Sequence, residues 1–346
     1  MIKINIKKLP KSEVEIEGEL EAGAFENYFQ KALKKIGKTL KLDGFRSGKI
    51  PESVLLSKVP EIRILEEMAE LALSEYYPKI LEDEKIDAIS HPQISLTKLA
   101  RKNPLGFKIK TAVLPEVKLP AYKDLAKNII SKLTDQDKNV AVSPEELENT
   151  IMDIRKSRAP KKHVTAGVKE ESVEEIPSFD DAFVQTLGPF KDIEDFKEKL
   201  KINIKLEKEN QNKEKTRLKI IEDIVEKTEI DLPEILVELE LDKILHRMES
   251  DITQMGLKFE DYLKHLNKTV ENLRSEFRND AEKKAKLTLI LNEISKAEKI
   301  VADQEQVEKE VALILEHYKD ADPERARAHA SNVLTNELIF QFLENQ

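Results

Sequence analysis

The segment Gly44–Lys49 comes nearest to a known chemical motif in this 346-residue chain. Its sequence is Gly-Phe-Arg-Ser-Gly-Lys, and glycines followed by a lysine are typical of loops that bind nucleotide phosphates. Three residues separate the two glycines, however, where a phosphate loop has four. Ile50 also stands where that loop needs a Ser or Thr to hold magnesium. The segment therefore gives no support to ATP binding.

Other catalytic arrangements are also missing from the sequence. The six histidines form no His-Glu-x-x-His motif and no pair four residues apart, so no zinc hydrolase ligand set is present. No Gly-x-Ser-x-Gly sequence marks a serine nucleophile, and the absence of cysteine excludes disulfides and thiolate chemistry. The many carboxylates are typical of solvated helix faces. We therefore expect neither an active site nor a metal or cofactor.

The same glycine-flanked segment is better suited to binding another macromolecule. It lies between two amphipathic segments, so Phe45 and Arg46 are expected at the exposed end of a loop. An aromatic residue beside an arginine is typical of an interface anchor. A helix–helix turn whose phenylalanine folds back into the core is the alternative, and the pattern alone favours neither.

Charge is concentrated around this loop. The chain carries a formal net charge of −9, yet residues 31–60 contain eight Lys or Arg residues and two acidic ones. A basic patch on an acidic protein indicates that one end of the molecule meets a polyanion. A solvated lysine-rich helix face that aids solubility is the other interpretation.

The elements that must position the loop follow from hydrophobic periodicity. Alternating residues predict strands over 2–7 and 13–20, and an apolar stripe with a lysine-rich opposite face predicts a helix over 22–42. A second stripe begins at Ile62 and ends near Pro78 or continues to about 84. Strands are expected over 93–98 and 105–115. These elements predict a compact α/β domain over residues 1–115.

The rest of the chain is expected to be helical. Residues 116–143 are polar and predicted to be extended, and a Ser-Pro-Glu-Glu start predicts a helix over 144–158. A flexible turn is expected at 159–177, followed by helices over 192–227, after Pro233 and over 270–300. Asp303 and Asp322 are predicted to cap the last two helices. The fold class is therefore α+β, with a linker over 116–177 and an elongated all-helical domain with arm-like projections over 178–346.

Location follows from what the composition lacks. The longest stretch without Asp, Glu, Lys or Arg covers ten residues, 88–97, whereas a membrane helix needs about 20 apolar residues. The first eight residues hold no apolar run typical of a secretion signal. We expect a cytoplasmic protein with no membrane partner.

The loop sequence Gly44-Phe45-Arg46-Ser47-Gly48-Lys49-Ile50-Pro51 resembles the Gly-Phe-Arg-x-Gly-Lys-x-Pro signature of bacterial trigger factor, a family of ribosome-associated chaperones. Later segments are similar to later parts of that family and occur in the same order: Val113-Leu114-Pro115-Glu116-Val117, Ile176-Pro177 with Phe179 and Ala182-Phe183, Leu232-Pro233, and Val301-Ala302-Asp303. The loop signature is specific, and together the matches cover nearly the whole chain.

The resemblance implies a docking site on the large ribosomal subunit, beside the exit tunnel. The implied site comprises Gly44, Phe45, Arg46, Ser47, Gly48 and Lys49, with Phe45 and Arg46 as the principal contacts to an exit-tunnel protein. Lysines of the preceding helix are expected to contact ribosomal RNA: Lys34, Lys38 and Lys41. Ser47 departs from the family, which usually has lysine there, so one positive charge is missing.

The resemblance also implies a domain that this chain lacks. Trigger factors commonly carry an FKBP-like peptidyl-prolyl isomerase domain of glycine-punctuated β structure. Between residues 107 and 255 the sequence contains only Gly167 and Gly188, and fewer than 20 residues separate Pro160 from Pro177. We therefore expect no isomerase domain and no enzymatic activity.

The expected function is that of an ATP-independent chaperone that holds nascent chains and aids their folding or export. Candidate client contacts lie along two predicted helices: Leu236, Leu239, Met248, Ile252, Leu287 and Leu291. Two alternatives remain, namely an active prolyl isomerase and a non-enzymatic helical scaffold. A coiled-coil scaffold needs sustained heptads, which the interrupted stripes do not show. A homodimer away from the ribosome is implied by the family and left open by the sequence.

Overall fold

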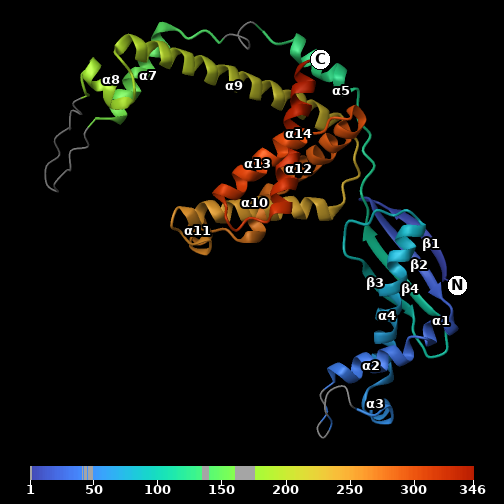
Figure 1. Ribbon diagram of the computed structural model, residues 1–346. Coiled ribbons are helices and arrows are strands. Elements are labelled where there is room, and N and C mark those ends of the chain that lie inside the picture. The colour runs from blue at the N-terminus through green and yellow to red at the C-terminus, as the bar shows by residue number, and fades with distance from the viewer. Residues whose placement is uncertain (1, 41, 43–44, 46–49, 135–139, 160–175) are drawn as a thin grey trace. The chain divides into compact units, whose positions relative to one another are not determined.

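The computed structural model describes residues 2–40, 42, 45, 50–134, 140–159 and 176–346 (Figure 1). The chain forms two compact units, and each combines segments that are distant in sequence. The first contains Met1–Leu119 and Thr228–Ala297, and the second contains Pro120–Lys227 and Glu298–Gln346. Boundaries after residues 115 and 177 are expected from sequence patterns; the contacts instead group residues 228–297 with the N-terminal segment. No helix in the described residues is long and apolar enough to cross a membrane.

An antiparallel sheet of four strands forms the N-terminal part of the first unit. The strands are β1 (Ile2–Leu9), β2 (Glu13–Leu20), β3 (Gln93–Lys98) and β4 (Leu105–Ala112), in the order β1-β2-β4-β3. The alternation in β2 explains its two faces, because Val14, Ile16 and Leu20 are buried while the glutamates between them point to the other side. On that side Glu13 pairs with Lys110 at 2.7 Å.

Among the described residues of this part, four helices accompany the sheet: α1 (Ala22–Glu26), α2 (Phe29–Thr39), α3 (Glu52–Lys58) and α4 (Glu61–Asp83). The helix predicted over 22–42 is thus two helices that end earlier. The helix is interrupted at Tyr28, where the Tyr28 N–H donates to the Phe25 carbonyl in a tight turn. The Tyr28 hydroxyl donates to Glu75 of α4 at 2.8 Å. Helix α4 continues through Pro78, as one of the two sequence alternatives proposed.

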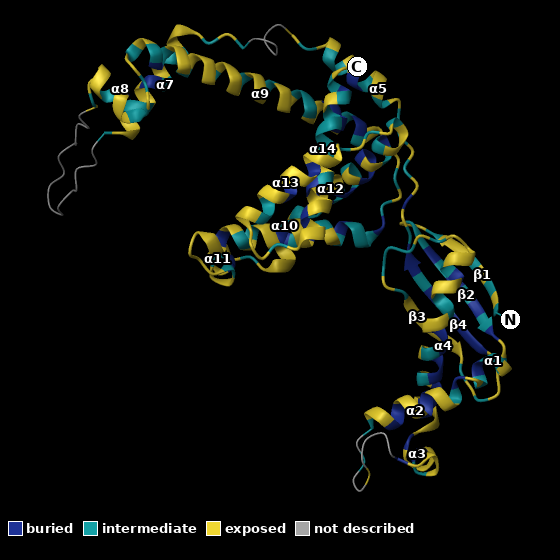
Figure 2. Cartoon of the chain, viewed as in Figure 1, coloured by how far each residue is buried: buried dark blue, intermediate teal, exposed yellow. Residues whose placement is uncertain are grey.

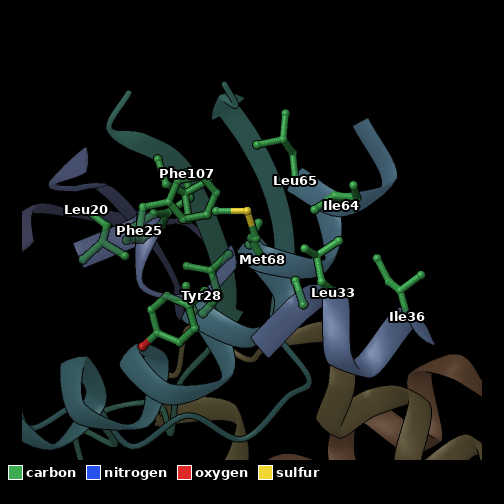
Figure 3. Close-up of a cluster of buried hydrophobic side chains, with 14 of the residues drawn as sticks. Leu20, Phe25, Tyr28, Leu33, Ile36, Ile64, Leu65, Met68 and Phe107 are labelled. Atoms are coloured by element: carbon green, nitrogen blue, oxygen red, sulfur yellow. The ribbon is translucent and has the colours of Figure 1, made fainter. Parts of the chain in front are cut away.

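The core of this part lies between the sheet and the helices. Figure 3 shows side chains from β2, α1, α2, α4 and β4 gathered in one cluster. Phe25, Met68 and Phe107 are fully buried there. Phe107 lies opposite Gly18 in the pairing of β2 with β4, and a Cβ at Gly18 would stand 2.5 Å from the Phe107 ring. Glycine at position 18 is therefore required by the close approach of this ring.

The remainder of the first unit is helical. It consists of α10 (Glu234–Gln254), α11 (Phe259–His265) and α12 (Val270–Glu298). Leu241 of α10 packs with Ala281 of α12, and Leu245, Leu263 and Leu273 form a second cluster that joins all three helices. The expected helix over 270–300 and the helix after Pro233 are both present.

The second unit is entirely helical in the residues that the structure describes. Its helices are α5 (Tyr122–Ser131), α7 (Pro144–Ser157), α8 (Asp181–Leu187), α9 (Ile193–Lys227), α13 (Gln304–His317) and α14 (Pro323–Glu344). Figure 2 shows that long stretches of α9 are exposed, in keeping with its nearly uninterrupted polar middle. The expected flexible turn at 159–177 lies mostly outside the described residues.

Helix starts in the second unit follow local sequence signals. The Glu146 N–H donates to the Ser143 hydroxyl at 3.1 Å, and the Gln306 N–H donates to Asp303 at 3.2 Å. The Arg325 N–H likewise donates to Asp322 at 2.9 Å. Helix α5 is a correction, because its residues were expected to be extended. It has no capping side chain, and its contacts with α9 and α14 stabilise it instead.

Candidate functional site

The loop between α2 and α3 holds the candidate docking residues. Gly44, Arg46, Ser47, Gly48 and Lys49 lie outside the described residues, so their predicted roles remain predictions. Phe45 is described: its N–H donates to the Leu42 carbonyl at 3.1 Å, and its side chain is 40% exposed. Leu42 packs against the core of the N-terminal part, whereas Phe45 is not a member of that cluster. The structure thus favours an exposed phenylalanine over one folded into the core.

Both ends of this loop are anchored in the core. Leu33 and Ile36 are buried on the inner face of α2, and the Leu40 N–H donates to the Ile36 carbonyl at 2.8 Å where the helix ends. On the other side Ile50 is buried, and the Pro51 carbonyl accepts the first hydrogen bonds of α3. The residues on both sides of the loop are therefore held by the packed core. Binding residues are commonly found on loops that a rigid scaffold positions in this way.

The lysines of α2 are not equivalent. Lys35 forms ion pairs with Glu67 at 2.6 Å and Glu70 at 3.0 Å on α4, and hydrogen bonds to these carboxylates raise the pKa of Lys35 above its usual value. Lys34 and Lys38 are exposed one helical turn apart and form no ion pair with any described residue. Lys41 lies outside the described residues. The charge available to an anionic partner is therefore on the Lys34–Lys38 face.

Two exposed apolar side chains near this loop in sequence do not appear among the expected site residues. Leu56 of α3 is 46% exposed and Ile62 at the start of α4 is 52% exposed. The sequence pattern assigns Ile62 to the buried stripe of its helix, but the residues that are buried at the start of α4 are Ile64 and Leu65. Together with Phe45 they give the α2–α4 part three exposed large apolar residues.

The candidate client contacts differ in accessibility. Leu239 on α10 is 46% exposed, and Leu236, Met248 and Leu287 are half-buried. Ile252 and Leu291 are buried, so in this structure their side chains belong to the packed interior. Helical periodicity alone does not separate a core stripe from a binding stripe, because both show the same spacing.

A more accessible apolar surface lies between α10 and α11. Met255 and Leu257 connect these helices and are 77% and 55% exposed. Beside them is an open groove of about 740 Å³, whose apolar lining includes Leu245, Phe259 and Leu263. Acidic residues that also line the groove are Asp242, Glu249 and Glu260. Met255 and Leu257 are not among the client contacts expected from the sequence. Two large apolar residues on either side of Gly256 are nevertheless visible in the sequence as an apolar turn.

Two models of one protein family match most of this sequence. Residues 2–154 match the model "Bacterial trigger factor protein (TF)", and residues 192–338 match "Bacterial trigger factor protein (TF) C-terminus". The matches are thus to the N-terminal and C-terminal domains of trigger factor, and no FKBP-type domain was detected.

Whole proteins of this family are similar along nearly the entire chain. The trigger factor of Clostridium tetani is 24% identical and covers 94% of this chain and 92% of its own length. That of Caldicellulosiruptor bescii is 24% identical over 92% of this chain and 89% of its own. A solved structure described as "Promiscuous Substrate Recognition in Folding and Assembly Activities of the Trigger Factor Chaperone" matches with a TM-score of 0.55 at 18% identity, over 99% of both chains. The chain therefore belongs to the bacterial trigger factor family of chaperones.

Proposed function

We propose that this chaperone docks on the large ribosomal subunit beside the exit tunnel and holds nascent chains without using ATP. Holding an emerging segment would delay its misfolding and aid its folding or export. The observation that carries the proposal is an exposed Phe45 in a family-specific loop, which follows a helix whose Lys34 and Lys38 form no ion pair with any described residue. Its partners would be an exit-tunnel protein, ribosomal RNA and unfolded polypeptides, all of which it would meet in the cytoplasm.

Docking would combine one apolar anchor with electrostatic attraction. A phenylalanine that is 40% exposed has apolar surface left to bury against a protein partner. Lys34 and Lys38 are free to meet RNA phosphates, because their charges are not neutralised by described carboxylates. Lys35 is expected to contribute less, since two glutamates already bind it.

Client holding would rely on several shallow apolar surfaces. Leu239, Met255 and Leu257 are accessible without rearrangement. Surfaces of this kind suit many sequences, because adaptable contacts do not demand one shape. Release would follow from folding of the client or from competition, since the sequence contains no nucleotide-binding motif to drive a cycle.

We also propose that the chain has no prolyl isomerase activity. The regions that match the two family models leave residues 155–191 between them. The alignment with the Clostridium tetani protein spans 397 positions although this chain has 346 residues, so the relative carries residues without a counterpart here. A proline-containing peptide assay on the purified chain tests the point, and robust turnover would contradict it.

Ribosome co-sedimentation at increasing salt tests the docking proposal. The Phe45→Ala and Arg46→Ala variants should each weaken binding by about tenfold, as expected for central anchors of an interface. Tyr318→Ala and Arg247→Ala are matched controls at exposed positions and should bind like the parent chain. Failure of the parent chain to pellet with ribosomes, or unchanged binding by the loop variants, would refute docking through this loop.

A further inference from the structure

A tight turn between β1 and β2 binds the carboxylate of Asp231, which lies 220 residues beyond Lys11 in the sequence. The Lys11 N–H donates to Asp231 Oδ1 at 2.9 Å, and the Ser12 N–H donates to Asp231 Oδ2 at 2.9 Å. The Ser12 hydroxyl donates to the Asp231 carbonyl at 2.6 Å. Successive backbone N–H groups in a turn form a concavity suited to an anion, and here a side chain of the same protein fills it.

The residue types in this turn are explained by the contact rather than by the turn. Lys11 and Ser12 have φ values of 61° and 46°, in the left-handed region. Tight hairpin turns with positive φ favour glycine and asparagine, because a Cβ is strained there. This chain has Lys and Ser instead, and both side chains are used. The Lys11 ammonium pairs with Glu234 at 3.0 Å, and the Ser12 hydroxyl binds Asp231.

The segment that contains Asp231 leads directly into α10, which ends beside the exposed Met255 and Leu257. Asp231 comes three residues before Glu234, the first residue of α10. Glu234 also pairs with Arg278 of α12, so the turn, α10 and α12 meet at one carboxylate. Hydrogen bonds from Arg278 and Lys11 lower the pKa of Glu234. A β-bridge between Lys118 and Glu229 adds a second attachment beside the first.

We infer that Asp231 is a positioning residue that fixes helices α10–α12 against the domain carrying the docking loop. The contact determines where the surface around Met255 and Leu257 stands relative to that domain. This inference rests on the proposed function for its purpose, because a client held by α10–α12 would then lie at a set place relative to the ribosome. The contact itself is a property of the isolated chain.

Distance measurement between two spin labels tests the contact without ribosomes. The chain has no cysteine, so Glu66→Cys on α4 and Glu260→Cys on α11 provide two unique labelling sites. In the parent chain we expect one narrow distance distribution. Asp231→Asn turns one acceptor into a donor that faces a backbone N–H, and it should broaden the distribution. Asp251→Asn, an exposed aspartate on α10, is the matched control and should leave it unchanged.

Amide hydrogen exchange supplies a local readout. In Asp231→Asn the amides of Lys11 and Ser12 should exchange about tenfold faster, because a hydrogen bond to a charged acceptor is lost. Ser12→Gly relieves the strained turn while removing the hydroxyl, so it keeps the domain folded and should broaden the distances less than Asp231→Asn. Unchanged distances in Asp231→Asn would overturn the inference.

The two proposals fail separately. If the parent chain does not bind ribosomes, the proposed function is wrong while the label distances still decide the role of Asp231. If Asp231→Asn binds ribosomes like the parent chain and its distance distribution broadens, both proposals are supported. If it binds ribosomes and its distances match the parent chain, only the positioning role of Asp231 is refuted.

Discussion

Replacing Arg217 with methionine is expected to detach the C-terminal end of α14 from α9. The Arg217 guanidinium binds both carboxylate oxygens of Glu337, at 2.7 and 2.8 Å, and Glu344 at 2.6 Å. It also lies over the Phe340 ring with 5.2 Å to the centroid. The side chain of Arg217 is only 11% exposed. Glu344 also pairs with Lys213, but at the longer distance of 3.6 Å and with a lysine that is 46% exposed.

The magnitude follows from which charges lose their partner. Removing one member of a buried ion pair costs about 3–5 kcal/mol, because the remaining charge is left without compensation. Glu344 is 16% exposed and would keep only the longer contact with Lys213, so it comes close to this case, whereas Glu337 is 42% exposed and can be solvated. Solvent therefore relieves part of the penalty, and we expect Arg217→Met to lower the stability of this contact by about 2 kcal/mol.

Amide hydrogen exchange along α14 measures this change locally, which is necessary because the chain has two compact units that need not unfold together. A loss of about 2 kcal/mol corresponds to roughly 30-fold faster exchange near Glu344. Arg327→Met is the matched control, since Arg327 pairs with Glu308 at 2.6 Å but both side chains are about half exposed. That control should change exchange by about fivefold at most, because an exposed ion pair contributes no more than about 1 kcal/mol.

A double variant separates lost attraction from uncompensated charge. Adding Glu344→Gln to Arg217→Met removes the stranded carboxylate, so part of the lost protection should return. Equal effects of Arg217→Met and Arg327→Met would refute the reasoning, because burial would then make no difference to these ion pairs. No recovery in the double variant would refute the explanation by uncompensated charge.

Three further outcomes are expected. Hydrogen bonds from Arg217 hold the pKa of Glu337 below its ordinary value of 4.5, so its contribution to stability is present above pH 4.5 and is lost as pH falls through the lowered pKa; acid titration of α14 exchange should accordingly be flatter in Arg217→Met. Phe107→Ala should destabilise the N-terminal part by about 3–5 kcal/mol, measured by denaturant unfolding, because this ring is fully buried; a cost below about 1 kcal/mol would contradict the packing described. Lys34→Gln with Lys38→Gln should weaken ribosome binding and reduce its salt slope by about 2, and an unchanged slope would exclude these lysines as phosphate contacts.

Local patterns predicted most of the fold because many elements are specified by their own residues. The alternation of Val14, Ile16 and Leu20 with glutamates requires a strand with one buried face. Ser143, Asp303 and Asp322 cap the helices that they were expected to cap. Such signals act over a few residues, so they can be recognised without knowledge of the tertiary structure.

The elements that were missed depend on distant partners. Helix α5 lacks a cap and spans only ten residues, and its contacts with α9 and α14 stabilise it. Tyr28, where the first helix is interrupted, donates a hydrogen bond to Glu75, which lies 47 residues away. The hydrogen bond between Lys11 and Asp231 joins residues 220 positions apart. The only local feature of the sequence that indicates it is an unusual Lys-Ser pair in the turn.

The candidate site was predictable where a motif specifies it and unpredictable where accessibility decides. Phe45 was found from its loop sequence, and the structure exposes it. Ile252 and Met255 are apolar residues only three positions apart, yet the first is buried and the second is 77% exposed. Only tertiary packing separates such neighbours.

Photo-crosslinking from position 45 tests the central claim most directly. A photoreactive phenylalanine analogue keeps the aromatic ring, so substitution for Phe45 should preserve docking while marking whatever lies within contact. We predict a crosslink from position 45 to a protein of the large ribosomal subunit, whereas the same analogue at Tyr318, which is 70% exposed, should give none. Equal crosslinking from both positions, or none from position 45 while the chain remains bound to ribosomes, would contradict docking through this loop.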